Sequence, residues 1–272
     1  MPVTRPLGVS TSLFRSVLGP DSEIEGIHAL QGTGITHIEY FCDDQDRNHT
    51  NPEHVAAVKQ AAADCGITIW SCHAPFGATD ISDPDESVRR MSLRRVIETL
   101  DAAVELAAGR VVLHGSREPI ADERRGQRLT QCVRSLNELC EQASQRGLVL
   151  ALELLPRTCL ANRSAEMQHI LDLTDGELRV CFDVNHITLY EGARDALEAL
   201  GPRIETLHIS DHDGIDERHW IPGRGVVDWH DFVAGLDAIG YEGCLMHEAR
   251  DADLDLAGNL AAIQEAAQRH LA

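Results

Sequence analysis

The sequence predicts a single-domain (β/α)8 TIM barrel, in which eight parallel strands are ringed by helices, over residues 1–272. Apolar runs of strand length alternate with longer segments of helical periodicity along the whole chain, and eight strand-then-helix units can be counted. The length of 272 residues is close to the roughly 250 residues typical of this fold. A doubly wound open sheet normally carries a glycine-rich phosphate turn after its first strand, whereas this chain has GVSTSLF there.

The predicted strands are short apolar runs, as expected for strands that are buried on both faces of a parallel barrel. The fifth, LVLALELL, is the most continuous of them. In chain order the strands are predicted at Pro6–Ser10, His37–Phe41, Ile67–Cys72, Arg110–Leu113, Leu148–Leu155, Leu178–Val184, Ile204–Ile209 and Gly243–Met246.

The predicted helices are recognised by apolar periodicity together with start and stop residues. For example, Asn51 and Pro52 are suited to the cap and the first position of a helix that Gly66 would end. In chain order the helices are predicted at Ser22–Gln31, Pro52–Asp64, Pro84–Ala108, Asp122–Arg146, Ser164–Leu173, Ala193–Leu200, Trp229–Ile239 and Asp253–Leu271.

Composition narrows the classes of function. With 24 Lys and Arg against 44 Asp and Glu, the formal net charge is −20, which disfavours nucleic acid as a partner. The only lysine, Lys59, lies in a helical pattern, so a Schiff-base aldolase with a strand-end lysine does not fit. Eight scattered cysteines without a C-x-x-C pair indicate reduced thiols and a cytoplasmic protein. No apolar window predicts a membrane segment or a secretion signal.

Polar side chains mark the ends of six consecutive predicted strands. They are His73, His114, Glu153, Asp183 with His186, His208 and Glu248. The carboxyl ends of barrel strands meet at one rim, where this fold carries its active site. A carboxylate inside an apolar run is costly unless it is paired or bound to a metal. The sequence therefore predicts a polar site at this rim, although any single histidine has an alternative as a hydrogen-bonded core residue, and Glu153 as a structural salt bridge.

The segment Ile204–Trp229 concentrates these groups most strongly. Within twelve residues it holds His208, Asp211, His212, Asp213, Asp216, Glu217 and His219. An acidic surface loop after a strand is the alternative interpretation, and the roles of Asp211, His212 and Asp213 stay open.

Four of the strand-end residues form a plausible ligand set for one divalent ion: Glu153, Asp183, His208 and Glu248. Three carboxylates with one imidazole suit manganese, magnesium or cobalt, whereas additional imidazoles shift the preference toward zinc. His247 neighbours Glu248 and should point to the opposite face of its strand, so it is not expected to be a ligand.

These residues lie in motifs that resemble the xylose isomerase-like TIM-barrel superfamily, which includes sugar and sugar-phosphate isomerases and epimerases and AP endonuclease family 2. The motifs are ALELLP, CFDVNH, HISDHDG, ERHWIPGRG and GYEGCLMHEA, and the likeness covers essentially the whole chain. In the epimerase branch one divalent ion is held by residues that match Glu153, Asp183, His208 and Glu248. The resemblance also implies that Glu153 and Glu248 act as acid and base.

The resemblance further implies substrate-binding residues. His186 and Arg218 would hold substrate oxygens, and His73, His114 and His219 are additional candidates. In the endonuclease branch, which uses three zinc ions, further ligands match His73, His114, His186 and His219, so a second or third metal is conceivable. That branch has Asp where this chain has Glu217, and Asn-Thr where it has Leu154-Leu155.

The leading hypothesis is therefore a divalent-metal-dependent sugar or sugar-phosphate isomerase or epimerase that transfers a proton through a metal-stabilised enediolate. An inosose-type dehydratase, an endonuclease IV-like AP endonuclease and a non-catalytic sugar-binding barrel are the alternatives. The predicted partner is a small sugar or polyol, and homo-oligomerisation is compatible with the sequence. Whether the substrate carries a phosphate stays open, with candidate cations at Arg15, Arg157, Arg218 and Arg224.

Overall fold

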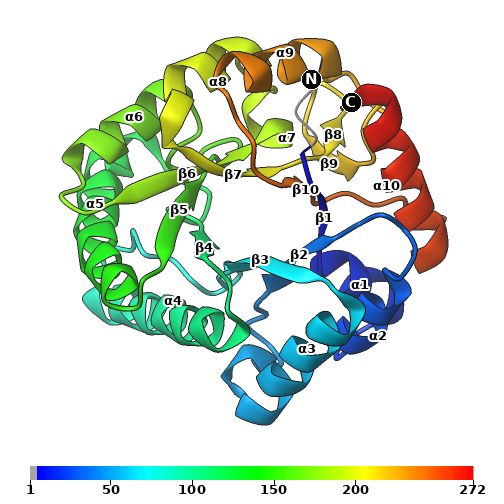
Figure 1. Cartoon of the computed structure of the whole chain (residues 1–272). Coiled ribbons are helices and arrows are strands. Elements are labelled where there is room, and N and C mark those ends of the chain that lie inside the picture. The colour runs from blue at the N-terminus through cyan, green and yellow to red at the C-terminus, as the bar shows by residue number, and fades with distance from the viewer. Residues whose placement is uncertain (1–4, 272) are drawn as a thin grey trace.

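The protein folds into the predicted parallel barrel. The computed structural model describes residues 5–271, so residues 1–4 and 272 of the predicted domain lie outside it. Eight parallel strands form one sheet in the order β10-β1-β2-β3-β4-β5-β6-β7, and Figure 1 shows them inside a ring of helices. The strands are β1 (Leu7–Ser10), β2 (His37–Phe41), β3 (Thr68–His73), β4 (Arg110–Leu113), β5 (Val149–Glu153), β6 (Leu178–Asp183), β7 (Ile204–His208) and β10 (Leu245–His247).

The barrel closes between the ends of β7 and β10. Ile209 forms a parallel bridge with His247, and its backbone N–H donates to the carbonyl of Met246 over 2.9 Å. The backbone N–H of Glu248 then donates to Ile209 over 3.1 Å. These bonds fix Glu248 at the carboxyl rim, beside Ile209, which directly follows His208.

The helices cover the outside of the barrel close to where the sequence predicts them. They are α2 (Glu23–Ala29), α3 (Pro52–Cys65), α4 (Glu86–Leu106), α5 (Asp122–Gln145), α6 (Ser164–Leu173), α8 (Ala193–Leu200), α9 (Trp229–Ala238) and α10 (Leu256–His270). Asn51 caps α3 as predicted, accepting from the backbone N–H of Glu53. The predicted start of the last helix, Asp253, is early because Asp255 is the residue whose side chain caps α10.

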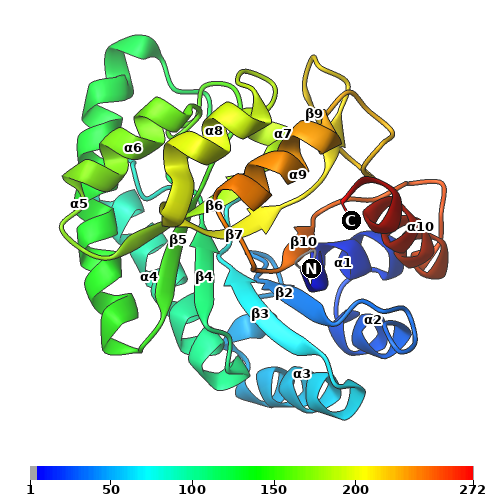
Figure 2. The same cartoon turned by 45° about the horizontal axis from the view of Figure 1, so that its top comes forward.

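Several short elements were not predicted. They are α1 (Ser12–Leu18), α7 (Val184–Ile187), the 3-10 helices η1 (Asn48–Thr50) and η2 (Gly201–Arg203), and an antiparallel hairpin of β8 (Asp211–His212) and β9 (Glu217–Trp220). Helix α1 has Thr11 at its N-cap position, but this side chain makes no cap hydrogen bond and the first turn has no acidic residue, so the start signal in the sequence is weak. Strand β9 lies next to α7, beyond the ends of β6 and β7 (Figure 2).

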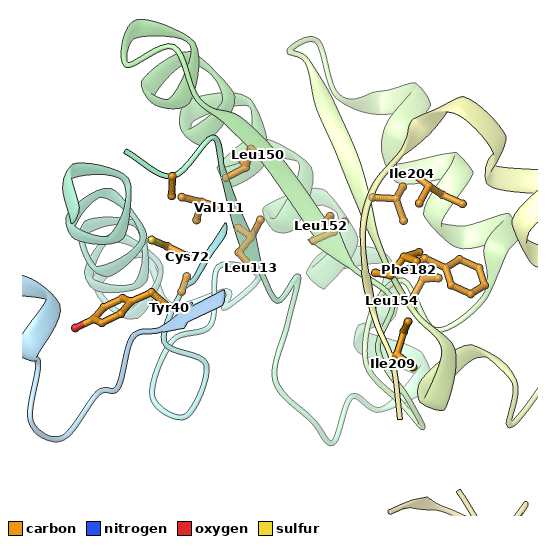
Figure 3. Close-up of a cluster of buried hydrophobic side chains, with 14 of the residues drawn as sticks. Tyr40, Cys72, Val111, Leu113, Leu150, Leu152, Leu154, Phe182, Ile204 and Ile209 are labelled. Carbon is orange, nitrogen blue, oxygen red and sulfur yellow. The ribbon is translucent and has the colours of Figure 1, made fainter. Parts of the chain in front are cut away.

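Alternation along β5 explains how the apolar core and the polar rim coexist. Leu150 and Leu152 belong to the main core between strands and helices, where Figure 3 shows them with Val111 and Phe182. Ala151 instead packs inside the barrel. Because strand side chains alternate with a period of two, Glu153 shares the inward face of Ala151. The inward position at the last residue of β5 therefore puts a carboxylate in the mouth of the barrel.

Along residues 5–271 no helix combines the length and the apolar character needed to cross a bilayer. All eight cysteines are free thiols.

The cysteines give a first testable prediction. Seven of them are buried and only Cys65 is partly exposed, and burial raises the pKa of groups such as the Cys140 thiol to about 11. Because the thiolate is the reactive form, we expect one fast-reacting thiol per folded chain in a dithionitrobenzoate assay, and loss of that fast phase in Cys65→Ser. Rapid reaction of several thiols under native conditions would contradict the buried placement.

Candidate metal centre and active site

Four predicted ligands meet at the carboxyl rim of the barrel. Each of Glu153, Asp183, His208 and Glu248 offers a ligand atom, and these atoms all lie within 4.8 Å of one another. They come from the ends of β5, β6 and β7 and from the residue after β10. Separate barrel strands thus bring together side chains that are up to 95 residues apart, Glu153 to Glu248.

The imidazole of His208 lies at the middle of this group. Its Nδ1 is 3.0 Å from Glu153 Oε1, 3.4 Å from Glu248 Oε2 and 3.9 Å from Asp183 Oδ2. All three neighbours are carboxylate oxygens, so without a cation a proton on Nδ1 helps to offset their charge. A divalent ion can bind among these groups in place of the Nδ1 proton.

Asp183 shows most directly that the group fits a cation. Its side chain is fully buried, and burial raises its pKa to about 6. Oδ1 accepts from the backbone N–H of His186 over 2.9 Å, whereas Oδ2 is buried without a hydrogen-bond partner. An unpartnered carboxylate oxygen facing two further carboxylates is costly unless a positive charge is bound among them. Three carboxylates and one imidazole are also suitable donors for a divalent ion.

A buried carboxylate that the sequence analysis missed, Glu39, orients His208. Its Oε1 lies 3.0 Å from His208 Nε2, and its Oε2 accepts from the hydroxyl of Ser71 over 2.7 Å. Burial acts to raise the pKa of Glu39, but His208 and Ser71 outweigh it and lower the pKa. Because the Nε2 proton is held by Glu39, the Nδ1 lone pair is available for the ligand group. The sequence feature that could have pointed to Glu39 is the presence of a glutamate inside the apolar run HIEYF.

Two further histidines contact Glu153. His73 Nε2 and His114 Nε2 each lie 3.0 Å from Glu153 Oε2. His73 is buried, and its Nδ1 donates to the carbonyl of Ala74 over 2.8 Å. Burial acts to lower the pKa of His73, but Glu153 outweighs it and the pKa rises to about 9. His73, Glu153 and His208 form a second group with metal-ligand spacing.

A third such group consists of His186, Glu217 and His219. His186 lies on α7, where its Nδ1 donates to the carbonyl of Leu154 over 2.9 Å and its Nε2 is 2.7 Å from Glu217 Oε2. Burial acts to lower the pKa of His186, but Asp183 and Glu217 raise it to about 10. Glu217, predicted as a departure from the Asp of the endonuclease branch, thus contacts His186. A second or third ion at these groups stays a prediction.

A cavity of about 280 Å³ opens onto the site. Its lining includes Glu153, Glu248, His114, His186 and His219, so both predicted acid–base residues face it. Its volume is near the lower end for small-molecule sites. A larger hollow of about 770 Å³ lies outside the barrel between α3 and α4, but none of the three candidate ligand groups lines it.

Comparison with known proteins identifies the fold family. The model of the family described as xylose isomerase-like TIM barrel matches residues 27–272, which is most of the chain. The chain belongs to the xylose isomerase-like TIM-barrel family. The family predicted from its motifs is thereby confirmed.

Relatives within the xylose isomerase-like family include sugar epimerases. A D-psicose 3-epimerase of Enterocloster bolteae is 24% identical over 229 residues, covering 80% of this chain and 74% of its own. A fructoselysine 3-epimerase of Escherichia coli is 30% identical over 169 residues, covering 58% of this chain and 59% of its own. The crystal structure of a D-tagatose 3-epimerase-like protein superimposes with a TM-score of 0.83 and 22% identity, covering 98% of this chain and 97% of that one. These names support the prediction of an isomerase.

The arginines considered for substrate or phosphate binding differ in their environment. Arg157 lies within 2.9 Å of carboxylate oxygens of Glu118, Asp216 and Glu217, so its charge is neutralised. Arg15 and Arg224 are likewise paired, Arg15 with Glu23, Asp43 and Asp46, and Arg224 with Asp251. Arg218 uses only its Nε, which donates to Asp213 over 2.7 Å.

Asp211, whose role the sequence leaves open, anchors the loop that follows β9. The buried carboxylate accepts from the backbone N–H groups of Gly223 and Gly225 over 2.9 Å and of Val227 over 3.1 Å. It also accepts from the indole N–H of Trp229 over 3.2 Å. Asp211 therefore acts on the shape of the rim and is not among the groups with metal-ligand spacing.

Asp211→Ala should be strongly destabilising. The substitution leaves the buried N–H donors of Val227 and Trp229 without an acceptor, each costing about 1–3 kcal/mol, so we expect a loss of at least about 2 kcal/mol. Thermal unfolding measures it, with Asp253→Ala, at an exposed loop position, as the control. An Asp211→Ala melting temperature equal to that of the control would show that the loop does not depend on this carboxylate.

Proposed function

We propose that this protein is a divalent-metal-dependent sugar epimerase or isomerase, which moves a proton at a carbon next to a carbonyl through an enediolate. The observation that carries the proposal is the convergence of Glu153 and Glu248 with Asp183 and His208 beside a small cavity. The names of its relatives, epimerases of psicose and fructoselysine, support sugars as the substrate class.

The two glutamates are suited to the proton transfers. Both line the cavity, and both approach His208 Nδ1, Glu153 within 3.0 Å and Glu248 within 3.4 Å. They come from β5 and from the residue after β10, which are not neighbours in the sheet. Epimerisation removes a proton from one face of a carbon and returns it to the other, which two separately placed carboxylates can do.

A divalent ion held by Glu153, Asp183, His208 and Glu248 would polarise the carbonyl and offset the charge that develops as the proton leaves. His186 and His219 line the same cavity and are placed to hydrogen-bond substrate oxygens. His219 is held by the carbonyl of Glu248, 3.0 Å from its Nδ1, which leaves its Nε2 for the substrate. His186 uses Nδ1 for Leu154 and Nε2 for Glu217, so it would exchange its contact with Glu217 for one with a substrate oxygen.

Phe76 forms an apolar part of the cavity wall. Phe76 stacks on the ring of His114 with a centroid separation of 4.7 Å, and both residues line the cavity. The ring of Phe76 therefore gives this side of the cavity an apolar surface against which the carbon chain of a substrate can lie.

Metal content and isotope exchange test the proposal together. We expect one tightly bound divalent ion per chain, and metal-dependent incorporation of solvent deuterium at the carbon next to the carbonyl of at least one member of a ketose panel, with unchanged product mass apart from the label. Loss of water from the product would indicate a dehydratase. Three zinc ions with cleavage of an abasic-site duplex would favour an endonuclease, for which the His186, Glu217 and His219 group is the structural argument.

A further inference from the structure

The mouth of the barrel has a second lobe. A hollow of about 240 Å³ is lined by Ser12, Ser16, Arg218, His219, Glu248 and Arg250 among others. His219 and Glu248 also line the main cavity. The two hollows therefore share His219 and Glu248 as a common border, so a substrate held against Glu248 lies next to the second lobe.

Arg250 is the distinctive residue of the second lobe. Its side chain makes no hydrogen bond or ion pair with any residue from 5 to 271, although most arginines in that range are paired with carboxylates. Its backbone N–H donates to the carbonyl of His219 over 2.9 Å, so the residue is fixed beside the candidate active site. Arg218 adds unused donors, because only its Nε is bonded, to Asp213.

The two lobes differ in their charge. In the main cavity Arg157 is surrounded by Glu118, Asp216 and Glu217. Arg117 also lines it and, like Arg250, has a side chain without an ion pair within residues 5–271, but the same lining carries the carboxylates of Glu118, Glu153, Glu217 and Glu248. In the second lobe the only carboxylate lining the hollow is Glu248, which belongs to the proposed ligand set. An anion would therefore meet excess negative charge in the main cavity and free guanidinium donors in the second lobe.

We propose that the second lobe binds an anionic group of the substrate, a phosphate or a carboxylate, through Arg250 and Arg218. This inference rests on the proposed function and specifies its substrate class as a ketose that carries a terminal anion. Guanidinium groups present several N–H donors in a planar fork that matches both oxyanions. A local pair of arginines is also what an anionic substrate needs in a chain with a formal net charge of −20.

The kinetic test compares a ketohexose, its terminal phosphate ester and the matching ketouronate. We expect kcat/KM to favour an anionic substrate by at least about tenfold, since a charge-assisted hydrogen bond contributes about that factor, and Arg250→Gln to remove most of this preference. Whichever of the two anions is preferred identifies the source of the charge. The matched control is Arg203→Gln, an exposed arginine in η2 before β7, at the opposite end of the barrel, which should keep the preference.

A binding test separates this inference from the proposed function. Inorganic phosphate is titrated calorimetrically into metal-loaded and metal-free protein, and we expect Arg250→Gln to weaken binding about tenfold or more in both forms while Arg117→Gln has a smaller effect. Loss of phosphate binding in Arg117→Gln alone, or no preference between neutral and anionic ketoses, would overturn the anion site and leave the epimerase proposal standing. Arg250-dependent phosphate binding without exchange on any ketose would keep the site and reject the proposed reaction.

Discussion

Glu153→Gln and Glu248→Gln should each reduce solvent-deuterium incorporation by about a hundred- to ten-thousandfold, the range expected when a general acid or base is lost. A carboxamide cannot accept the proton from the substrate, yet it keeps the shape of the side chain. Both residues line the cavity, so each is placed to exchange a proton directly with the reacting carbon of the substrate. Exchange is followed by nuclear magnetic resonance on the substrate identified from the ketose panel.

Both glutamates also belong to the proposed ligand set, so metal content must be measured in each variant. We expect residual binding at saturating metal, because three of the four ligands remain, and the exchange rates are compared under that condition. Glu242→Gln, at an exposed position before β10, is the matched control and should retain normal exchange. Undiminished exchange in both metal-loaded variants would end the acid–base roles assigned to Glu153 and Glu248.

The residues at the rim could be predicted from the sequence because the fold places them by a simple rule. Glu153, Asp183 and His208 each follow an apolar run, and the carboxyl ends of parallel strands meet at one edge of a barrel. The alternation that turns Leu152 toward the helices turns Glu153 inward. A strand-end carboxylate was thus enough to predict that these side chains meet, and their ligand atoms do lie close together.

Contacts between particular side-chain atoms could not be predicted from the sequence. Glu39 and His208 are separated by 169 residues, and nothing in the run HIEYF indicates which histidine its carboxylate meets. The cations around the mouth show the same limit. From the sequence, Arg157 and Arg218 are equivalent candidates for binding an anion. Only the folded loops show that Arg157 is neutralised by Glu217 while Arg218 keeps unused donors.

On the β8–β9 hairpin, Arg218 makes different side-chain contacts from its neighbours Glu217 and His219. The β8–β9 pairing has a register shift, and His219 has a positive φ of 49°, so simple alternation does not apply here. Glu217 and His219 both belong to the His186 group. Arg218, between them in the sequence, instead contacts Asp213. The resemblance assigns Arg218 to substrate oxygens together with His186 because Arg218 lies near the seventh loop, and this role stays a prediction.

Glu39→Gln is expected to weaken divalent-metal binding by about 10- to 100-fold, the usual effect of removing a carboxylate that orients a ligating histidine. Glu39 holds the Nε2 proton of His208 over 3.0 Å, which leaves Nδ1 facing Glu153 and Glu248. Glutamine fills the same space but brings no charge, and its amide can also turn an N–H group toward the ring. The ligand then loses basicity and its preferred tautomer, although none of the four ligands has been changed.

Competition with a chromogenic chelator measures this affinity, and Ser71→Ala is the graded control. That variant removes only the hydroxyl that donates to Glu39 Oε2 over 2.7 Å and keeps the carboxylate, so its effect should be smaller than that of Glu39→Gln. An affinity in Glu39→Gln equal to that of the unsubstituted protein would mean that His208 is not a ligand or does not need orienting. The buried Glu39–His208 pair would then serve only the packing of the barrel interior.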